Sequence, residues 1–397
     1  METPESPRLK IAPGQGQVRG KQIRSVQINQ NLTDTVCLNC RNVGTMSPVD
    51  GFLRCPSCNH AYLLFGNIPV LLKDFRLSLA AAHQQHQTLI DYNEERLEEI
   101  QDAKGRQPER AVLDRGIHAY ETDNRYLKLL QNAIQTHVPK AEIAEMVEEG
   151  RLPRQYRMSE GIAFFHRDWC RSARAEAEIA TIIDTVFAQV DAYADDVDSV
   201  LIPGAGAGRF ACELSAKYDN CFAFDYSVHM TQIFYDLLER DLTLHRVNFQ
   251  SNVIKTEDVV VGYDLSLDAP GSNRIKSQLE KGNLSYFIGD ALNVPLPGNS
   301  LSAIACLYFI DIVPLKEHLI EIRRMLKPGG LFINLGPLRY MRGDVANMLS
   351  GEEILSLFRE SGFDILAQDF VTNTQLASSP VITITTSHNF MFVARKR

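Results

Sequence analysis

The sequence has no apolar run of the ~18 residues that a helix needs to cross a bilayer. Residues 1–30 are polar and lack the apolar core of a signal peptide. Lysine and arginine are outnumbered by aspartate and glutamate, 41 against 49, so the net charge of −8 gives the chain no general attraction to nucleic acid or anionic membranes. We therefore expect a cytoplasmic protein that does not bind membranes, and nucleic acid is a disfavoured partner.

Cysteine is also scarce, with 8 residues in 397. Four of them form a tight pattern that is typical of metal ligands. The other four are scattered among apolar or helical neighbours, at Cys170, Cys212, Cys221 and Cys306. This distribution indicates a reducing compartment, in which cysteines bind metal or pack in the core and do not form disulfides.

The composition that remains is ordinary for a globular protein, with 45% hydrophobic and 23% charged residues, and the length suggests two or three domains. Residues 1–30 have no apolar period and predict a disordered leader. Short strand-like runs separated by turns predict a small separate module over residues 31–73. Residues 74–188 have helical periodicity with charged faces, which predicts a helical segment between that module and the rest of the chain.

From residue 189 to residue 397, short apolar strands alternate with helices, which predicts a mainly parallel, doubly wound α/β sheet. The stretch 226–283 is far longer than the usual loop of ~2–6 residues plus a helix, so it has room for an insertion. A helix is predicted over residues 316–326. The predicted strands are 199–203, 221–225, 284–288, 302–308, 331–335, 364–367 and 390–394.

The metal-like pattern consists of Cys37-Leu38-Asn39-Cys40 and, after 14 intervening residues, Cys55-Pro56-Ser57-Cys58. Cys37, Cys40, Cys55 and Cys58 together supply the four thiolates of a tetrahedral zinc site. The alternatives are chance pairs or a redox dithiol, and no thioredoxin-like strand context surrounds either pair. A closed shell of four thiolates has no position for a zinc-bound water, so we assign the predicted zinc a structural role.

The same segment resembles the Trm112-like zinc ribbon, in which paired cysteines are followed by an aromatic residue and an apolar ending. Here these are Tyr62 and Gly66-Asn67-Ile68-Pro69-Val70-Leu71-Leu72, with one asparagine inserted after the glycine. Relatives of that ribbon associate with methyltransferases as subunits or as fused domains. The resemblance therefore implies a zinc ribbon beside a methyltransferase.

A glycine-rich turn that ends at Arg209 follows the first predicted strand of the sheet and leads into a helix predicted over residues 210–217. Strand, glycine turn and helix form the nucleotide-binding corner of a doubly wound sheet, because glycines let a ligand approach the backbone. The spacing G-x-G-x-G differs from the G-x-G-x-x-G of dinucleotide enzymes and disfavours a dehydrogenase. Asp225 ends the next strand, 17 residues beyond the last glycine, and we expect it to accept hydrogen bonds from two ribose hydroxyls. The glycines are Gly204, Gly206 and Gly208.

Closely spaced glycines with an acid at the end of the next strand resemble the S-adenosylmethionine loop of class I methyltransferases. Gly289-Asp290-Ala291 agrees, because in those enzymes an acid in this phrase, here Asp290, lies beside the adenine amino group. Lys327-Pro328-Gly329-Gly330, after the predicted helix, also matches the later part of that fold. The resemblance implies a Rossmann-like class I methyltransferase sheet that binds S-adenosylmethionine.

Several less common phrases between residues 160 and 397 together resemble the carnosine N-methyltransferase family. They are Phe165-His166-Arg167-Asp168-Trp169, Tyr308-Phe309-Ile310-Asp311 and Asn334-Leu335-Gly336-Pro337-Leu338. The resemblance implies methyl transfer to a ring nitrogen of a histidine-like compound. It also implies that Trp169 and Arg209 lie near the methionine end of the cofactor. The alternative for Trp169 is a core anchor.

Asp311 follows the fourth strand, at the rim where substrates bind in open sheets, and we assign it a catalytic role. An acid there can orient an imidazole through its N–H and leave the lone pair of the other nitrogen free. The alternative is a helix N-cap for the segment after Pro314. The other expected substrate contacts are Tyr308, Asn334, Tyr340 and Asn389.

Two departures from the family concern the acceptor. Met341 follows Tyr340 where the carnosine enzymes have a histidine, and His388 and Asn389 stand where those enzymes have adjacent tyrosines. We therefore expect carnosine to be a poor substrate and the acceptor to be another small nitrogen compound or a peptide. The runner-up is an oxygen acceptor on a specialised metabolite, for which His388 or Asp311 would be the catalytic base.

Two further readings are a non-catalytic methyltransferase-like adaptor and an RNA-modifying methyltransferase. The glycine turn with Asp225 weakens the first reading, and the net charge of −8 weakens the second. The sequence does not decide the oligomeric state, and a homodimer is one option. The RNA reading depends on a single basic face made by Arg151, Arg154, Arg157, Arg167, Arg171 and Arg174.

Overall fold

The computed structural model describes residues 35–397 except 154–156, 250–252, 268–274, 276–278, 341–343 and 377–383. The predicted leader, Arg154 and Met341 therefore lie outside the described residues. Within the described ranges, no helix is both long enough and apolar enough to span a membrane.

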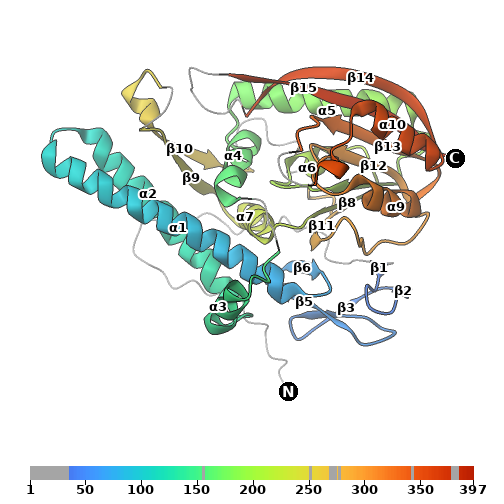
Figure 1. Ribbon diagram of the computed structural model, residues 1–397, viewed down its shortest axis with the longest axis horizontal. Helices are drawn as coiled ribbons and strands as arrows, with labels where there is room; N and C mark the ends of the chain where they lie inside the picture. The colour runs from blue at the N-terminus through green and yellow to red at the C-terminus, as the bar shows by residue number, and fades with distance from the viewer. Residues whose placement is uncertain are drawn as a thin grey trace.

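One sheet of 11 strands runs through the molecule, in the order β14-β15-β13-β12-β7-β8-β11-β6-β5-β4-β3 (Figure 1). The strands from β13 to β6 are parallel to one another, and antiparallel strands extend the sheet at both ends. This arrangement confirms the predicted doubly wound, Rossmann-like class I methyltransferase sheet. The strands are β3 (Ser47–Val49), β4 (Phe52–Arg54), β5 (Ala61–Phe65), β6 (Ile68–Leu71), β7 (Ser199–Pro203), β8 (Asn220–Asp225), β11 (Leu284–Gly289), β12 (Leu301–Leu307), β13 (Leu326–Gly336), β14 (Phe363–Gln375) and β15 (Thr385–Lys396).

Helices cover both faces of this sheet because its central strands are buried on both sides. Apolar side chains of α5, α6 and α7 pack in one cluster with one face, and those of α9 and α10 pack in a second cluster with the other face. The helices are α1 (Phe75–Arg106), α2 (Ala111–Gln135), α3 (Lys140–Glu148), α4 (Met158–Trp169), α5 (Ala173–Tyr193), α6 (Arg209–Leu214), α7 (Val228–Glu239), α9 (Leu315–Met325) and α10 (Gly351–Glu360).

The four-cysteine module is part of the main sheet, so the prediction that it is structurally separate is wrong. Strand β6 pairs in parallel with β11, with Val70 opposite Ile288. The connection 290–300 between β11 and β12 contains no helix, and apolar residues of the module, including Tyr62, share a buried cluster with Val294 of this connection. The module therefore covers a part of the sheet where a helix is missing.

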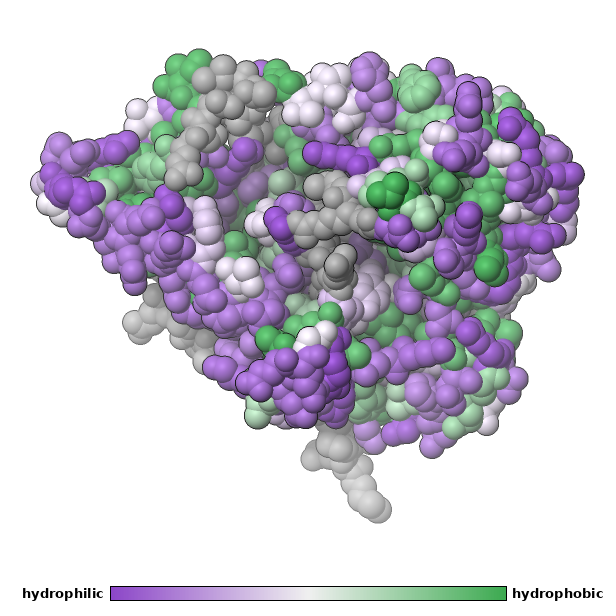
Figure 2. Space-filling view, viewed as in Figure 1, coloured by the Kyte–Doolittle hydropathy of each residue, from purple (hydrophilic) through white to green (hydrophobic). Residues whose placement is uncertain are grey.

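The helical segment forms an arm beside the sheet. Helices α1 and α2 pack against each other and extend away from the sheet, and the surface of the arm is mostly hydrophilic (Figures 1 and 2). The amides of Asn93 and Asn124 form a buried hydrogen bond of 2.8 Å between these helices. The predicted insertion between β8 and β11 contains a hairpin, β9 (Leu242–Val247) and β10 (Val260–Leu265), which packs against α2 and α4.

The last two strands are longer than the sequence predicts. Strands β14 and β15 pair from Phe363 to Gln375, whereas the apolar pattern predicts strand only at 364–367 and 390–394. Beyond the apolar part the two strands carry polar side chains such as Asn373 and Asn389. Hydrophobic alternation does not detect this extension, because it depends on pairing with a neighbouring strand and on contacts between polar groups.

Several histidines are buried in this fold. His86 and His229 have no exposed surface, and His318 is 1% exposed. Burial lowers the pKa of His229 to about 3 and that of His318 to about 4, and it holds the pKa of His86 well below its usual range. These imidazoles stay neutral in the folded chain, whereas the unfolded chain protonates them near its usual pKa of about 6.5.

We expect the free energy of unfolding to fall on acidification below about pH 6.5, because only the unfolded chain takes up the protons. Each buried histidine contributes up to about 1.4 kcal/mol per pH unit until its folded pKa is reached. Urea unfolding between about pH 7 and pH 5 measures this slope. His318→Phe should make this slope shallower, because it removes one of the buried imidazoles. A slope unchanged in that variant would contradict the assignment.

Candidate functional site

The glycine turn lies between β7 and α6, at the end of the sheet where the parallel strands finish. All three glycines have left-handed φ angles, 62° at Gly204, 55° at Gly206 and 81° at Gly208. A Cβ atom would collide with Phe309 at Gly204 and would lie 2.5 Å from Phe234 at Gly208. At Gly206 the nearest atom, in the side chain of Met230, would be 3.7 Å away, so a Cβ atom would fit there without a collision. The glycines therefore have different roles: two allow packing, and one leaves space.

Asp225 ends β8 and supports the turn from one side. Its Oδ2 accepts the N–H of Gly206 at 2.8 Å, and its Oδ1 accepts the N–H of Ser227 at 2.8 Å. Burial raises the pKa of Asp225, and the backbone N–H groups of Ser227 and Gly206 oppose that rise. A carboxylate has about four lone-pair positions, so Asp225 keeps acceptor capacity for a ligand.

Two buried aromatic side chains hold the turn from behind. The hydroxyl of Tyr286, on β11, donates to the carbonyl of Gly206 at 2.7 Å. The indole N–H of Trp169, at the end of α4, donates to the carbonyl of Ala207 at 2.8 Å. Trp169 has no exposed surface, so it anchors the loop, and any influence on a cofactor would pass through this loop. Tyr286 was not predicted, because a tyrosine in an apolar strand has the pattern of a core residue.

Arg209 faces a buried network of acids. Its guanidinium donates to Glu176 at 2.8 Å, to Glu213 at 3.0 Å and to the carbonyl of Asp168 at 2.7 Å. Beside it, Arg167 donates to Asp168 at 2.6 Å. All three nitrogens of Arg209 thus donate within the protein, and the network joins α4, α5 and α6 behind the glycine turn.

Asp290 directly follows β11, the strand that pairs with β8. Within β11, Ile288 is the parallel partner of Asp225 at the end of β8. The Oδ1 of Asp290 accepts the N–H of Leu292 at 2.9 Å, and the residue is half-buried. The structure therefore brings the two predicted cofactor acids to the same edge of the sheet, beside the open Gly206.

A polar cluster lies on the other side of the turn, near the end of β12. Tyr308 follows β12 with a φ of 56°. The amide of Asn373 donates to the Tyr308 hydroxyl at 3.2 Å, and the amide of Asn389 donates to Asn373 at 2.6 Å. Asn389 has no exposed surface, and its Oδ1 has no partner among the described residues. The structure therefore joins Tyr308 and Asn389 through Asn373, which the sequence pattern did not identify.

Asp311 and Tyr340 lie together on the neighbouring loops. The Oδ2 of Asp311 accepts the N–H of Arg339 at 2.8 Å and that of Tyr340 at 3.3 Å. The Tyr340 hydroxyl donates to the carbonyl of Leu349 at 2.9 Å, so its polar atom is already engaged. Asp311 therefore ties together the loops after β12 and β13.

Two predicted substrate or catalytic residues are not brought to this cluster. His388 is exposed and hydrogen-bonds to Thr372 at 2.9 Å. It precedes Asn389 in β15 and therefore projects from the opposite face of the strand. The amide of Asn334 donates to the carbonyl of Phe390 at 2.8 Å, in a fully buried position. This geometry gives Asn334 a role in strand packing.

The four cysteines have the geometry of a tetrahedral metal site. All four sulfurs lie within 4.8 Å of one another, and two pairs, Cys37–Cys58 and Cys40–Cys55, are separated by 3.7 and 3.8 Å. Tetrahedral zinc with Zn–S bonds of about 2.3 Å places its sulfurs about 3.8 Å apart. The Tyr62 hydroxyl lies 3.3 Å from the sulfur of Cys37. This donor set fits zinc.

The arginines between residues 151 and 174 do not form one basic face among the described residues. Arg167 is 3% exposed and pairs with Asp168. Arg171 pairs with Glu176, Arg157 with Glu160, and Arg151 with Glu149. Burial takes Arg167 out of such a face, and three of the other arginines are paired with acids, which weakens the RNA reading.

A family model described as carnosine N-methyltransferase matches residues 148–397 of this chain. A carnosine N-methyltransferase of Drosophila melanogaster is 29% identical over 238 residues, which are 54% of this chain and 49% of that protein. The carnosine N-methyltransferase of Mus musculus is 28% identical over 220 residues, 51% of this chain and 53% of that protein. The chain thus spans about half the length of these curated relatives. A carnosine N-methyltransferase of Schizosaccharomyces pombe is 23% identical over 64% of this chain and 79% of its own length.

The different roles of the glycines predict different costs of substitution. Gly206→Ala adds a side chain at positive φ without a collision and should destabilise the fold by about 1–2 kcal/mol. Gly208→Ala adds the same strain and a collision with Phe234, so it should cost about 1–3 kcal/mol more. Urea unfolding of the two variants measures the difference. Equal losses of stability would contradict the packing role of Gly208.

Proposed function

Because this chain belongs to the carnosine N-methyltransferase family across residues 148–397, we propose that it is an S-adenosylmethionine-dependent N-methyltransferase. The observation that carries the proposal is the open Gly206, whose N–H is held by Asp225 inside the matched segment. S-adenosylmethionine supplies an electrophilic methyl group. The acceptor is a nitrogen of a histidine-like small molecule or peptide.

The cofactor side of the site is made by residues at the ends of β7, β8 and β11. Gly206 leaves room for the cofactor to approach the backbone. Asp225, whose oxygens already accept two N–H groups, uses its remaining lone pairs for ribose hydroxyls. Asp290, at the end of the next strand, takes the adenine amino group. Trp169 and Arg209 act from behind by keeping the turn rigid.

The acceptor side is made by Asp311 and by the cluster of Tyr308 and Asn389. Asp311 holds two backbone N–H groups with one oxygen, and its other oxygen has no partner among the described residues. That oxygen orients an imidazole by accepting its N–H, which leaves the lone pair of the second ring nitrogen available. A neutral imidazole is already nucleophilic, so the chain mainly contributes alignment and exclusion of water.

Carnosine is the first acceptor to test. The family match gives no support to the expectation that carnosine is a poor substrate. Of the residues behind that expectation, His388 is exposed beside Thr372, and Met341 lies outside the described residues. The placement of His388 leaves Asp311 as the predicted base for the alternative of an oxygen acceptor.

A structural zinc completes the proposal. Cys37, Cys40, Cys55 and Cys58 would hold it in a closed shell that has no place for a reacting water. Cys37 and Cys55 belong to the same buried cluster as the sheet, so the metal would stabilise the module and the sheet together.

Substitutions at two acids should separate cofactor binding from turnover. Asp225→Asn should weaken binding of S-adenosylhomocysteine by about 10- to 100-fold, because charge-assisted hydrogen bonds are worth about 1.5–3 kcal/mol. Asp311→Asn should keep the affinity for S-adenosylhomocysteine and lose most methyl transfer to carnosine. Mass spectrometry of single methyl additions measures this transfer. Asp102→Asn, on the exposed side of α1, is the control for both measurements. Unchanged affinity in Asp225→Asn would overturn the ribose role, and an absence of transfer to every histidine-like acceptor would overturn the function.

Purified chain should contain one tightly bound zinc per molecule, because structural zinc contributes directly to folding. Metal analysis and thermal unfolding test this. Cys55→Ser combined with Cys58→Ser should lose the metal and lower the unfolding temperature, whereas Cys170→Ser, outside the cluster, should retain it. Zinc retained in the double variant, or a metal-free chain of unchanged stability, would refute the assignment.

A further inference from the structure

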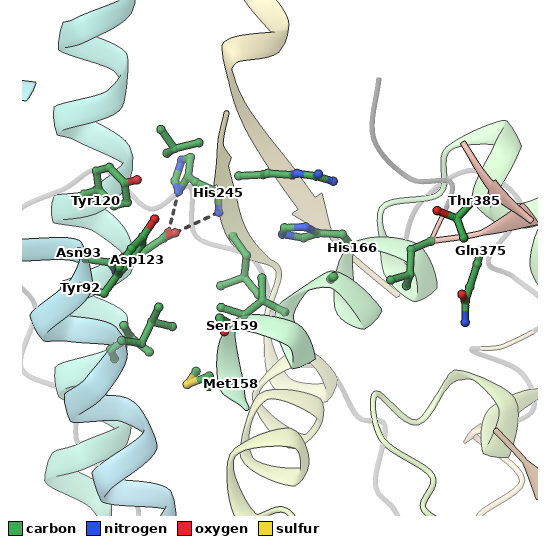
Figure 3. A pocket seen from close by; sticks show the side chains of 18 of the residues that line it. Tyr92, Asn93, Tyr120, Asp123, Met158, Ser159, His166, His245, Gln375 and Thr385 are labelled. Atoms are coloured by element: carbon green, nitrogen blue, oxygen red, sulfur yellow. Dashed lines mark hydrogen bonds and ion pairs between the residues drawn. The ribbon is translucent and has the colours of Figure 1, made fainter. Parts of the chain in front are cut away.

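A large cavity lies between the helical arm and the end of the sheet. It has a volume of about 800 Å³ and is lined by residues of α1, α2, α4, α5, β9 and the far ends of β14 and β15. Figure 3 shows Asp123 and His245 on one side of it and Gln375 and Thr385 on the other. This volume is within the range of sites that hold small molecules, about 300–1,000 Å³.

His166 gives the cavity an acceptor without a partner. It is 3% exposed, lines the cavity from α4, and its Nε2 has no hydrogen-bond partner among the described residues. In Figure 3 its ring extends from α4 toward the side of His245. Burial lowers the pKa of His166 to about 3, with Arg246 and His245 adding to the shift and the backbone of Leu244 opposing it. The imidazole is therefore neutral, and a buried nitrogen of this kind needs a partner from a ligand or water.

The charge of the cavity wall is positive. Arg174, Arg246 and Arg339 line it, against a single acid, Asp123, which pairs with His245 at 2.7 Å. The guanidinium of Arg246 donates to the amide oxygen of Asn248 at 2.9 Å. Within the described parts of the chain, none of the three arginines has an ion pair. Guanidinium groups match carboxylates in geometry, so this wall suits an anionic ligand.

Two parts of the cavity wall adjoin residues of the proposed acceptor site. Arg339, which lines it, is held through its backbone N–H by Asp311. Thr374 and Gln375 also line it and directly follow Asn373, which hydrogen-bonds to Tyr308. The wall at Arg339 and at Thr374 and Gln375 is therefore the part of the cavity nearest in the structure to Asp311 and Tyr308.

We propose that this cavity binds the carboxylate end of the methyl acceptor through Arg174, Arg246 and Arg339, while His166 accepts an N–H of the same molecule. The inference rests on the proposed function and narrows it, because it requires acceptors that carry a carboxylate several bonds from the methylated nitrogen. Histidine-containing peptides with a free C-terminus have this chemistry, and the corresponding amides lack it.

The test compares carnosine with its C-terminal amide by calorimetric titration into chain saturated with S-adenosylhomocysteine. Wild-type chain should bind carnosine about 10-fold or more tightly than the amide, as expected for a charge-assisted contact. Arg174→Gln and Arg246→Gln should each weaken binding of carnosine but not of the amide. Arg125→Gln, at an exposed position on α2 outside the cavity, should change neither affinity.

Several results would overturn the inference. They are equal affinity for the two compounds, equal effects of the arginine variants on both, or no binding of either. If L-histidinol phosphate bound more tightly than carnosine, the arginines would prefer a phosphate to a carboxylate, and this result would also refute the inference. Carboxylate-dependent binding with no methyl transfer would support the cavity assignment and count against the proposed function alone.

Discussion

The fixed shape of the loop 204–208 is the constraint on which the candidate site depends. Asp225 holds the N–H of Gly206, Tyr286 holds its carbonyl, and Trp169 holds the carbonyl of Ala207. These contacts come from β8, β11 and α4, so three separate elements set one backbone conformation. Helix α4 also carries His166, three residues before Trp169, into the large cavity. Helix α4 therefore holds the glycine loop through its last residue, Trp169. One helical turn earlier, it contributes His166 to the cavity wall.

The four-cysteine module is connected to the same cavity through helix α1. Its last strand, β6, pairs with β11, whose own end carries Asp290. Helix α1 begins with Phe75, shortly after β6 ends at Leu71, and residues farther along α1, including Asn93, line the cavity. The position of the arm thus follows from the position of β6.

Sequence patterns predicted the parts of the structure that local chemistry determines. Strands β7, β8, β11 and β12 lie within about a residue of their predicted bounds, because each is a short apolar run between turn residues. The roles of Tyr286 and Asn373 and the pairing of β6 with β11 were not predictable in this way. Asn373 meets Tyr308 across 65 residues of sequence, and β6 meets β11 across more than 200. These contacts depend on the tertiary fold and have no local pattern.

This division explains why the methyl donor is easier to infer than the acceptor. Every proposed cofactor contact lies at a strand end that a motif identifies, whereas the acceptor side combines α2, α4, β9, β14 and the loop at Arg339. Departures from a family motif consequently say little about the acceptor unless the changed side chains reach the cavity. His388 projects from the opposite face of β15 and does not line the cavity, so this departure does not alter the charge of the cavity wall. Because guanidinium groups discriminate by charge, the arginines are better placed than His388 to decide which histidine-like compounds bind.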